Sequence, residues 1–211
     1  MSTITAITPT TRPPGRFDLV VDGTRFATLS LDAIERLALA VGRSVAGMEE
    51  RIEFEAAALK VYDRALNLLA FRARSSAELA RSLVQKGEAK EHVDRAIDRL
   101  TEQGLLDDAA FARSFTRAKV LGAKQSRRRV QQLLARKGVA RDVSDEAIDA
   151  VFEEEGVDQS GVVEEAARKK LRSLAKLEPA VQSRRLYAFL ARRGYEADDI
   201  RAAMRELGIR N

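Results

Sequence analysis

The sequence predicts an all-α protein of three tandem three-helix repeats that form an elongated array, preceded by a small β-hairpin and a short helix. The main observation is a segment that recurs three times and ends at Gly87, Gly138 and Gly194. In each copy the positions four and eight residues before the glycine are apolar, which is the spacing of one helix face. The segments on both sides of these glycines also align, so each repeat is expected to contain three helices.

The N-terminal part is expected to be separate from the repeats. Residues 1–15 are rich in Thr and Pro and lack periodicity, so they predict a disordered lead. A β-hairpin and a short helix are expected at 16–49. Two apolar runs flank Asp22 and Gly23, the dipeptide that favours a type I′ hairpin turn. Asp32 is then expected to cap the short helix.

The three helical repeats are placed at 50–108, 109–156 and 157–211. The residue before each closing glycine is a cation, which suits the negative end of a helix dipole. Glycine at that position can adopt the left-handed conformation that ends many helices. The segment 75–78, Ser-Ser-Ala-Glu, is typical of a capping box and predicts the start of the middle helix of the first repeat.

The joint between the first two repeats runs from Gly104 to Phe111. Gly104 ends one helix, Asp107 can cap the next and Phe111 begins a new apolar face, so this joint is expected to be rigid. The carboxylates of Asp107 and Asp108 resemble a metal-binding pair, but capping and packing explain them better because no further ligand lies nearby. The second joint, at 153–158, is acidic and lacks a comparable apolar pair, so it is expected to be the more flexible one.

Composition excludes several classes of function. The chain of 211 residues has no cysteine, which removes disulfides, thiolate zinc sites and cysteine nucleophiles. No apolar run is long enough for a signal peptide or a membrane span, so a cytoplasmic protein without a membrane partner is expected. The single histidine, His92, is expected to face solvent. The segment 122–124 lacks the earlier glycine and the hydroxyl of a phosphate-binding loop. We therefore expect no enzyme activity, no catalytic residue, no metal and no cofactor.

The charge pattern is uneven around the second repeat. Every charged residue from Lys124 to Arg141 is a cation, and every charged residue from Asp142 to Asp158 is an acid. One interpretation is that these side chains pair between neighbouring helices of the repeat. The other is a docking strip, since cations at a helix N-terminus oppose the dipole unless an acidic partner or a phosphate compensates them. Cations recur in the other repeats, and rows of them would suit a helical polymer with acidic patches or the DNA inside it.

The segment from Gly104 to Asp108, followed by Phe111 and Ala112, resembles the RecX family of recombinase regulators when it is taken with Arg74-Ser75 and the three glycine segments. The resemblance covers roughly 60–211. It implies three tandem three-helix units that bind the filament of the RecA recombinase on DNA. It also implies modulation of filament assembly, ATP hydrolysis, strand exchange and repressor cleavage in recombination, DNA repair and the SOS response, with inhibition favoured over tuning. It implies no catalysis.

Two alternatives from other classes are a DNA-binding protein that competes with the recombinase for single strands, and a helical scaffold for another partner. A monomer is expected in each case. The candidate residues for contact with the recombinase or DNA are Arg64, Arg113, Lys124, Arg127, Arg128, Arg129, Arg136, Lys137, Lys169, Lys170, Arg184, Arg185, Arg192 and Arg193. The residues expected to define the structural motif are Gly87, Gly104, Asp107, Asp108, Phe111, Gly138 and Gly194.

Overall fold

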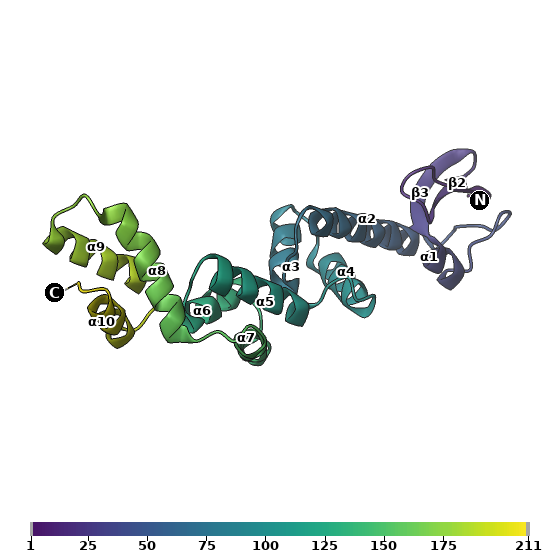
Figure 1. Cartoon of the computed structure of the whole chain (residues 1–211). Coiled ribbons are helices and arrows are strands. Elements are labelled where there is room, and N and C mark those ends of the chain that lie inside the picture. The colour runs from purple at the N-terminus through teal and green to yellow at the C-terminus, as the bar shows by residue number, and fades with distance from the viewer. Residues whose placement is uncertain (1, 210–211) are drawn as a thin grey trace. The chain divides into compact units, whose positions relative to one another are not determined.

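The computed structural model describes residues 2–209 and divides into two compact units. The first unit comprises residues up to 73 together with 79–105, and the second comprises 74–78 together with the residues from 106 on. Figure 1 shows the order of the elements along the chain. The first unit contains β1 (Ile4–Pro9), β2 (Arg16–Val21), β3 (Thr24–Ser30), α1 (Leu31–Arg36), α2 (Glu49–Phe71), most of α3 (Ser76–Gln85) and α4 (Lys90–Glu102).

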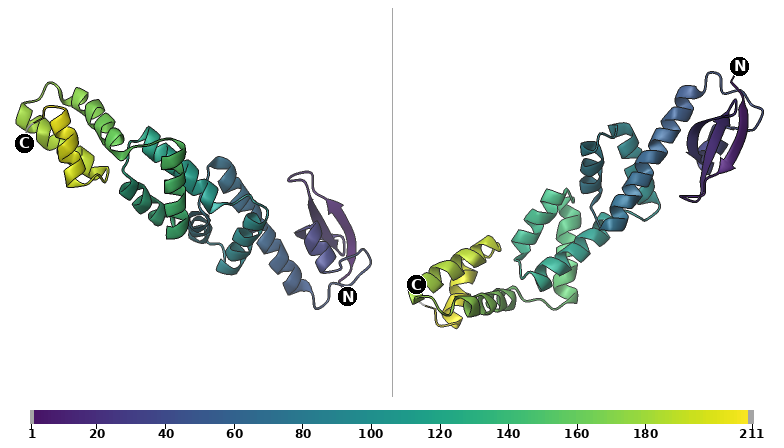
Figure 2. Two further views of the ribbon diagram at one scale, coloured as in Figure 1. Left: turned by 60° about the horizontal axis from the view of Figure 1, so that its bottom comes forward. Right: turned by 90° about the horizontal axis from the view of Figure 1, so that it is seen from above.

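The N-terminal sheet has three antiparallel strands in the order β1-β2-β3, and α1 follows directly from β3 (Figure 2). The expected disordered lead at 1–15 is therefore wrong, because β1 pairs with β2 and Ile4 is completely buried. Thr is β-branched and suits a strand, so the Thr-rich composition was compatible with β1. The predicted turn is confirmed, with φ of +49° at Asp22 and +80° at Gly23. The expected cap is corrected, since the hydroxyl of Ser30 and not Asp32 accepts from the Ala33 N–H.

The first repeat is built from α2, α3 and α4, and α2 packs on α4. Its buried apolar residues recur at helical spacing, with Leu79 and Leu83 on α3 and Val93 and Leu100 on α4. The helix α2 also packs against the N-terminal sheet, because the side chain of Ile52 is completely buried in the core beneath it. The appendage and the first repeat consequently share one long helix.

The second unit contains the other two repeats. Its elements are α5 (Asp108–Arg117), a π-helical turn η1 (Ala118–Gly122), α6 (Arg127–Lys137), α7 (Arg141–Glu154), α8 (Gln159–Leu174), α9 (Pro179–Arg192) and α10 (Ala197–Glu206). Helix α5 packs on α7 in the second repeat, and α8 packs on α9 and α10 in the third. Leu134 and Ile148 lie in the core of the second repeat, and Leu186 and Ile200 lie in that of the third. The predicted all-helical class with three three-helix repeats is confirmed.

The glycines that close the repeating helices have the predicted conformation. Gly87, Gly138 and Gly194 have φ of +86°, +81° and +85°, and Gly104 has +67°. The division between the compact units falls at 105–106, within the first joint, and the expected rigidity of the first joint and flexibility of the second stay predictions. The second and third repeats belong to one unit.

Candidate partner-binding surface

A buried serine connects each of the first two repeats to the repeat that follows. Ser75 and Ser126 stand at the same distance before the closing glycines of their own repeats, and both are almost completely buried. The hydroxyl of Ser75 accepts from the Glu78 N–H at 3.2 Å and donates to the Lys137 carbonyl oxygen at 2.6 Å. The hydroxyl of Ser126 likewise caps α6 and also donates to the next repeat. The helix caps of one repeat are thus bonded to the closing segment of the next.

The second joint has further contacts that hold the third repeat. The backbone N–H of Ser126 donates to the Arg193 carbonyl at 3.1 Å, and the hydroxyl of Tyr195 donates to the Lys124 carbonyl at 2.8 Å. Burial raises the pKa of Tyr195 above its ordinary value. A β-carbon on Gly194 would lie 2.7 Å from the β-carbon of Arg129, so the joint leaves no space for a side chain there.

Most of the candidate cations of the second repeat are paired within the chain. Their pairs are Lys124–Glu165 at 2.7 Å, Arg127–Asp149, Arg128–Glu196 and Lys137–Glu78 at 3.0 Å. Arg117 pairs with Glu154 at the end of α7 and with the next residue, Glu155. Its hydrogen bond to Glu155 raises the pKa of the Arg117 guanidinium. The interpretation of intramolecular pairing is therefore confirmed for Arg127 and α7. Arg136 lies exposed on α6, and Arg113 lies exposed on α5.

The cations of the third repeat have a different environment. Arg184, Arg185 and Arg192 are exposed on α9, and none has a carboxylate partner among residues 2–209. Lys169 is exposed on α8, whereas Arg64 of the first unit pairs with Glu88. Arg185 and Arg192 lie about two helical turns apart and share one face of α9, and Arg184 is next to Arg185. Within the second unit, the positive charge that has no carboxylate partner is therefore greatest on the third repeat of the chain.

Two further candidates of the third repeat meet at one aromatic ring. The ammonium of Lys170 lies 5.4 Å from the ring centroid of Phe189, and the guanidinium of Arg193 lies 4.5 Å from it. The ring itself packs against the core of the repeat, as its helical spacing predicts. Cations within about 6 Å of an aromatic face are attracted to it. Phe189 therefore fixes Lys170 and Arg193 close together.

The motif residues at the first joint are structural. The carboxylate of Asp107 accepts from the N–H groups of Ala109 and Ala110, which confirms it as the cap of α5. The carboxylate of Asp108 accepts from the Ser76 N–H at 2.7 Å, so it helps to start α3. Phe111 is half-buried and stacks on Phe115 with 5.8 Å between ring centroids.

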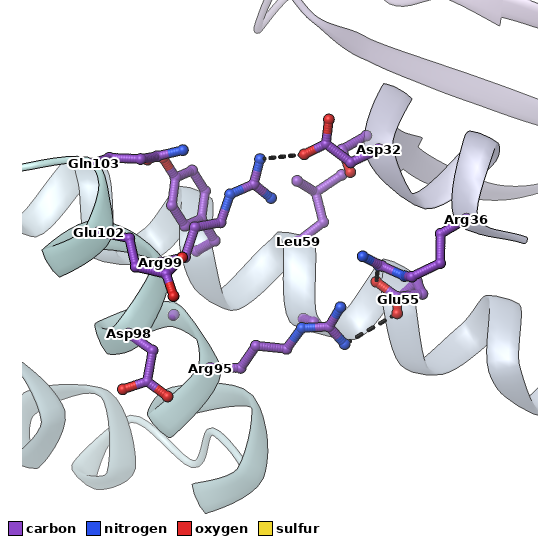
Figure 3. Close-up of a pocket in the computed structure, with 13 residues that line it drawn as sticks. Asp32, Arg36, Glu55, Leu59, Arg95, Asp98, Arg99, Glu102 and Gln103 are labelled. Carbon is purple, nitrogen blue, oxygen red and sulfur yellow. Dashed lines mark hydrogen bonds and ion pairs between the residues drawn. The ribbon is translucent and has the colours of Figure 1, made fainter.

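The first unit has a polar hollow of about 500 Å³ between α1, α2 and α4 (Figure 3). Its charged groups are largely paired with each other. The carboxylate of Glu55 forms ion pairs with both Arg36 and Arg95, and Arg99 pairs with Asp32 at 2.9 Å. These pairs fasten the appendage to the first repeat.

His92, which was expected to face solvent, is half-buried, and its ring lies 4.6 Å from that of Phe54. In the described part of the chain no group of three or more His, Asp or Glu side chains could hold a metal ion. No helix among residues 2–209 has the length and apolar character needed to cross a lipid bilayer.

Each of the three repeats matches a model of a known protein domain. Models of the first, second and third three-helix domains of RecX match 62–100, 107–148 and 162–204. The chain belongs to the RecX family. Regulatory protein RecX of Chlorobaculum tepidum is 36% identical over 143 residues, which cover 68% of this chain and 85% of the relative. Regulatory protein RecX of Halorhodospira halophila is 37% identical over 151 residues, which cover 72% and 90%.

Solved RecX structures have the same fold. A crystal structure of regulatory protein RecX matches with a TM-score of 0.78 at 20% identity, covering 97% of this chain and all of the other. RecX from Lactobacillus salivarius matches with a TM-score of 0.58 at 19% identity, covering 73% and 98%. The predicted family is thus confirmed. RecX proteins are named as regulators and are not a known enzyme family.

Proposed function

We propose that this RecX-family chain binds the filament of the RecA recombinase on DNA and inhibits its assembly. ATP hydrolysis, strand exchange and co-protease activity would fall with the filament. Membership of the family supports a regulatory role, and the charge distribution supports a polyanionic partner. The observation that carries the proposal is that the cations on α9 are exposed and lack carboxylate partners among the described residues.

The position of these cations suits a filament. Arg184 and Arg185 lie two helical turns before Arg192, so α9 presents positive charge along its length. A filament carries acidic groups and DNA phosphates at regular intervals, and exposed cations that are not neutralised by their own chain can approach them without first breaking an ion pair. The paired cations of α6 would have to give up Asp149 and Glu196 before they could do the same.

A charge reversal on α9 tests the proposal. The double variant Arg184→Glu with Arg185→Glu should fold normally, because both side chains are exposed, and should lose inhibition of RecA ATP hydrolysis on single-stranded DNA. Lys60→Glu, on an exposed position of α2, is the control for the change of charge. A folded double variant that inhibits as strongly as the wild type would refute the role of α9.

Competition for single strands is the second candidate, since the same exposed cations suit DNA alone. A pull-down with preassembled filament, free RecA and bare single strand separates the two. Retention by filament and weak retention by bare DNA supports the filament. Tight binding to bare DNA, with inhibition abolished by excess strand, supports competition.

A further inference from the structure

The two joints between repeats carry different charges at corresponding positions. At the first joint Glu78 follows the capping serine, and both of its carboxylate oxygens lie 3.0 Å from the ammonium of Lys137. Counted from the closing glycines, Arg129 stands at the second joint where Glu78 stands at the first. Arg193 stands there in place of Lys137. An ion pair at one joint thus corresponds to two arginines at the other.

Both arginines are fixed at the second joint by other contacts. The β-carbon of Arg129 packs against Gly194, the residue next to Arg193. Arg193 donates to the Lys124 carbonyl at 3.1 Å and lies over the ring of Phe189. The Nε of Arg129 is buried and has no hydrogen-bond acceptor within residues 2–209. A buried donor without an acceptor is costly, so this group indicates a missing partner.

Three acids near the joint do not supply that partner, because other cations hold them. The occupied pairs are Lys124–Glu165, Arg128–Glu196 and Arg127–Asp149. Neither Arg129 nor Arg193 has a carboxylate partner in the part of the chain that the structure describes. The neighbouring Arg192 is exposed and adds a third uncompensated charge. The joint therefore carries excess positive charge around a position that an acid fills at the first joint.

We infer that the second joint is an anion site, in which a phosphate of single-stranded DNA takes the place that the Glu78 carboxylate holds at the first joint. Guanidinium groups present several donors in a planar fork that matches phosphate oxygens, and a phosphate at the joint would accept from the guanidinium of Arg129. DNA is favoured over an acidic peptide because the exposed cations continue along α9, which suits a regularly spaced polyanion. That this strand is the one inside a recombinase filament rests on the proposed function.

The variant Arg129→Glu tests the inference because it recreates the charges of the first joint. The new glutamate would face Arg193, so the melting temperature should rise by about 2 to 4 °C. The affinity for a labelled oligo(dT) should fall by at least about tenfold, since the site gains a negative charge and loses an arginine. Arg129→Gln should weaken DNA binding without the rise in melting temperature. It should also reduce the slope of log K against log salt by about 0.7, the value for one phosphate contact on a single strand.

The measurements are fluorescence anisotropy at several salt concentrations and thermal melts, with Lys60→Glu in the other compact unit as control. The inference is overturned if Arg129→Glu melts no higher than the wild type, or if both Arg129 variants bind oligo(dT) with wild-type affinity and salt slope. Displacement of oligo(dT) by polyglutamate as effectively as by unlabelled oligo(dT) would indicate an acidic-peptide site and would also overturn it. These assays omit RecA. A chain that binds DNA through Arg129 but leaves RecA filaments unaffected would refute the proposed function alone.

Discussion

The hydroxyl of Ser126 donates a hydrogen bond of 2.7 Å to the carbonyl oxygen of Gly194, and the two residues lie in successive repeats. The same hydroxyl accepts from the Arg129 N–H at 3.2 Å and so caps α6. One side chain therefore starts a helix and joins it to the next repeat. Ser75 does the same with the Lys137 carbonyl, which makes this arrangement a repeated feature of the fold.

Replacing Ser126 by Ala should lower the free energy of unfolding by about 1 to 3 kcal/mol. The change removes a helix cap and leaves the Gly194 carbonyl without this donor at a buried joint. Urea unfolding followed by circular dichroism measures the loss. Ser173→Ala is the control, because the exposed Ser173 hydroxyl bonds within α8 to the Lys170 carbonyl and to no other described residue. Equal effects of the two changes would show that the joint does not depend on Ser126.

Gly194 and Gly87 offer a matched comparison. Their φ angles are +85° and +86°, so alanine at either position should cost about 1 kcal/mol in backbone strain. At Gly194 the added carbon would also lie 2.7 Å from Ser126 Oγ, whereas at Gly87 it meets nothing within 4 Å. Gly194→Ala should therefore be more destabilising by about 1 to 3 kcal/mol, the usual cost of overpacking. Similar unfolding free energies for the two variants would contradict the described packing.

The pairing of Arg127 with Asp149 predicts a modest effect of charge reversal. Both side chains are largely exposed, so Arg127→Glu should cost about 1 kcal/mol or less in stability, and Asp149→Lys in the same chain should restore it. Thermal melts of the two single variants and the double variant measure the coupling. A docking strip centred on Arg127 predicts instead that RecA regulation is lost without rescue by Asp149→Lys.

The sequence predicted the repeats well because their signals are local. Apolar spacing and closing glycines mark helices within a few residues, and Asp107 begins its helix as expected. Strand β1 is missed because its segment is rich in Thr and Pro and lacks periodicity, which favours disorder, although it pairs with the next strand β2.

The charged surface is predicted less well, because ion pairs depend on which side chains meet in space. The sequence identifies a run of cations, but it does not show which of them find an acid in space. Arg127 and Arg128 look unpaired in the sequence and are paired by residues from α7 and from the loop before α10. The buried Nε of Arg129 depends on how closely the second and third repeats pack, so only the structure identifies it. Ser126 could have been found from its alignment with Ser75.

Tyr195 predicts how the stability of the second joint depends on pH. The residue is 5% exposed, its hydroxyl donates to the Lys124 carbonyl, and burial raises its pKa in the native state. An unfolded tyrosine ionises near pH 10, so above about pH 10 the unfolded chain loses a proton that the native chain keeps. The stabilisation from this group is thus complete below pH 10 and is lost as the pH rises further. Tyr195→Phe lacks the hydrogen bond and should be less stable than the wild type at pH 7 by about 1 kcal/mol. Because phenylalanine does not ionise, the difference between the two proteins should shrink above pH 10 in denaturant unfolding experiments. A difference that stays constant from pH 7 to about pH 11 would show that the Tyr195 hydroxyl ionises with equal ease in the native and unfolded states.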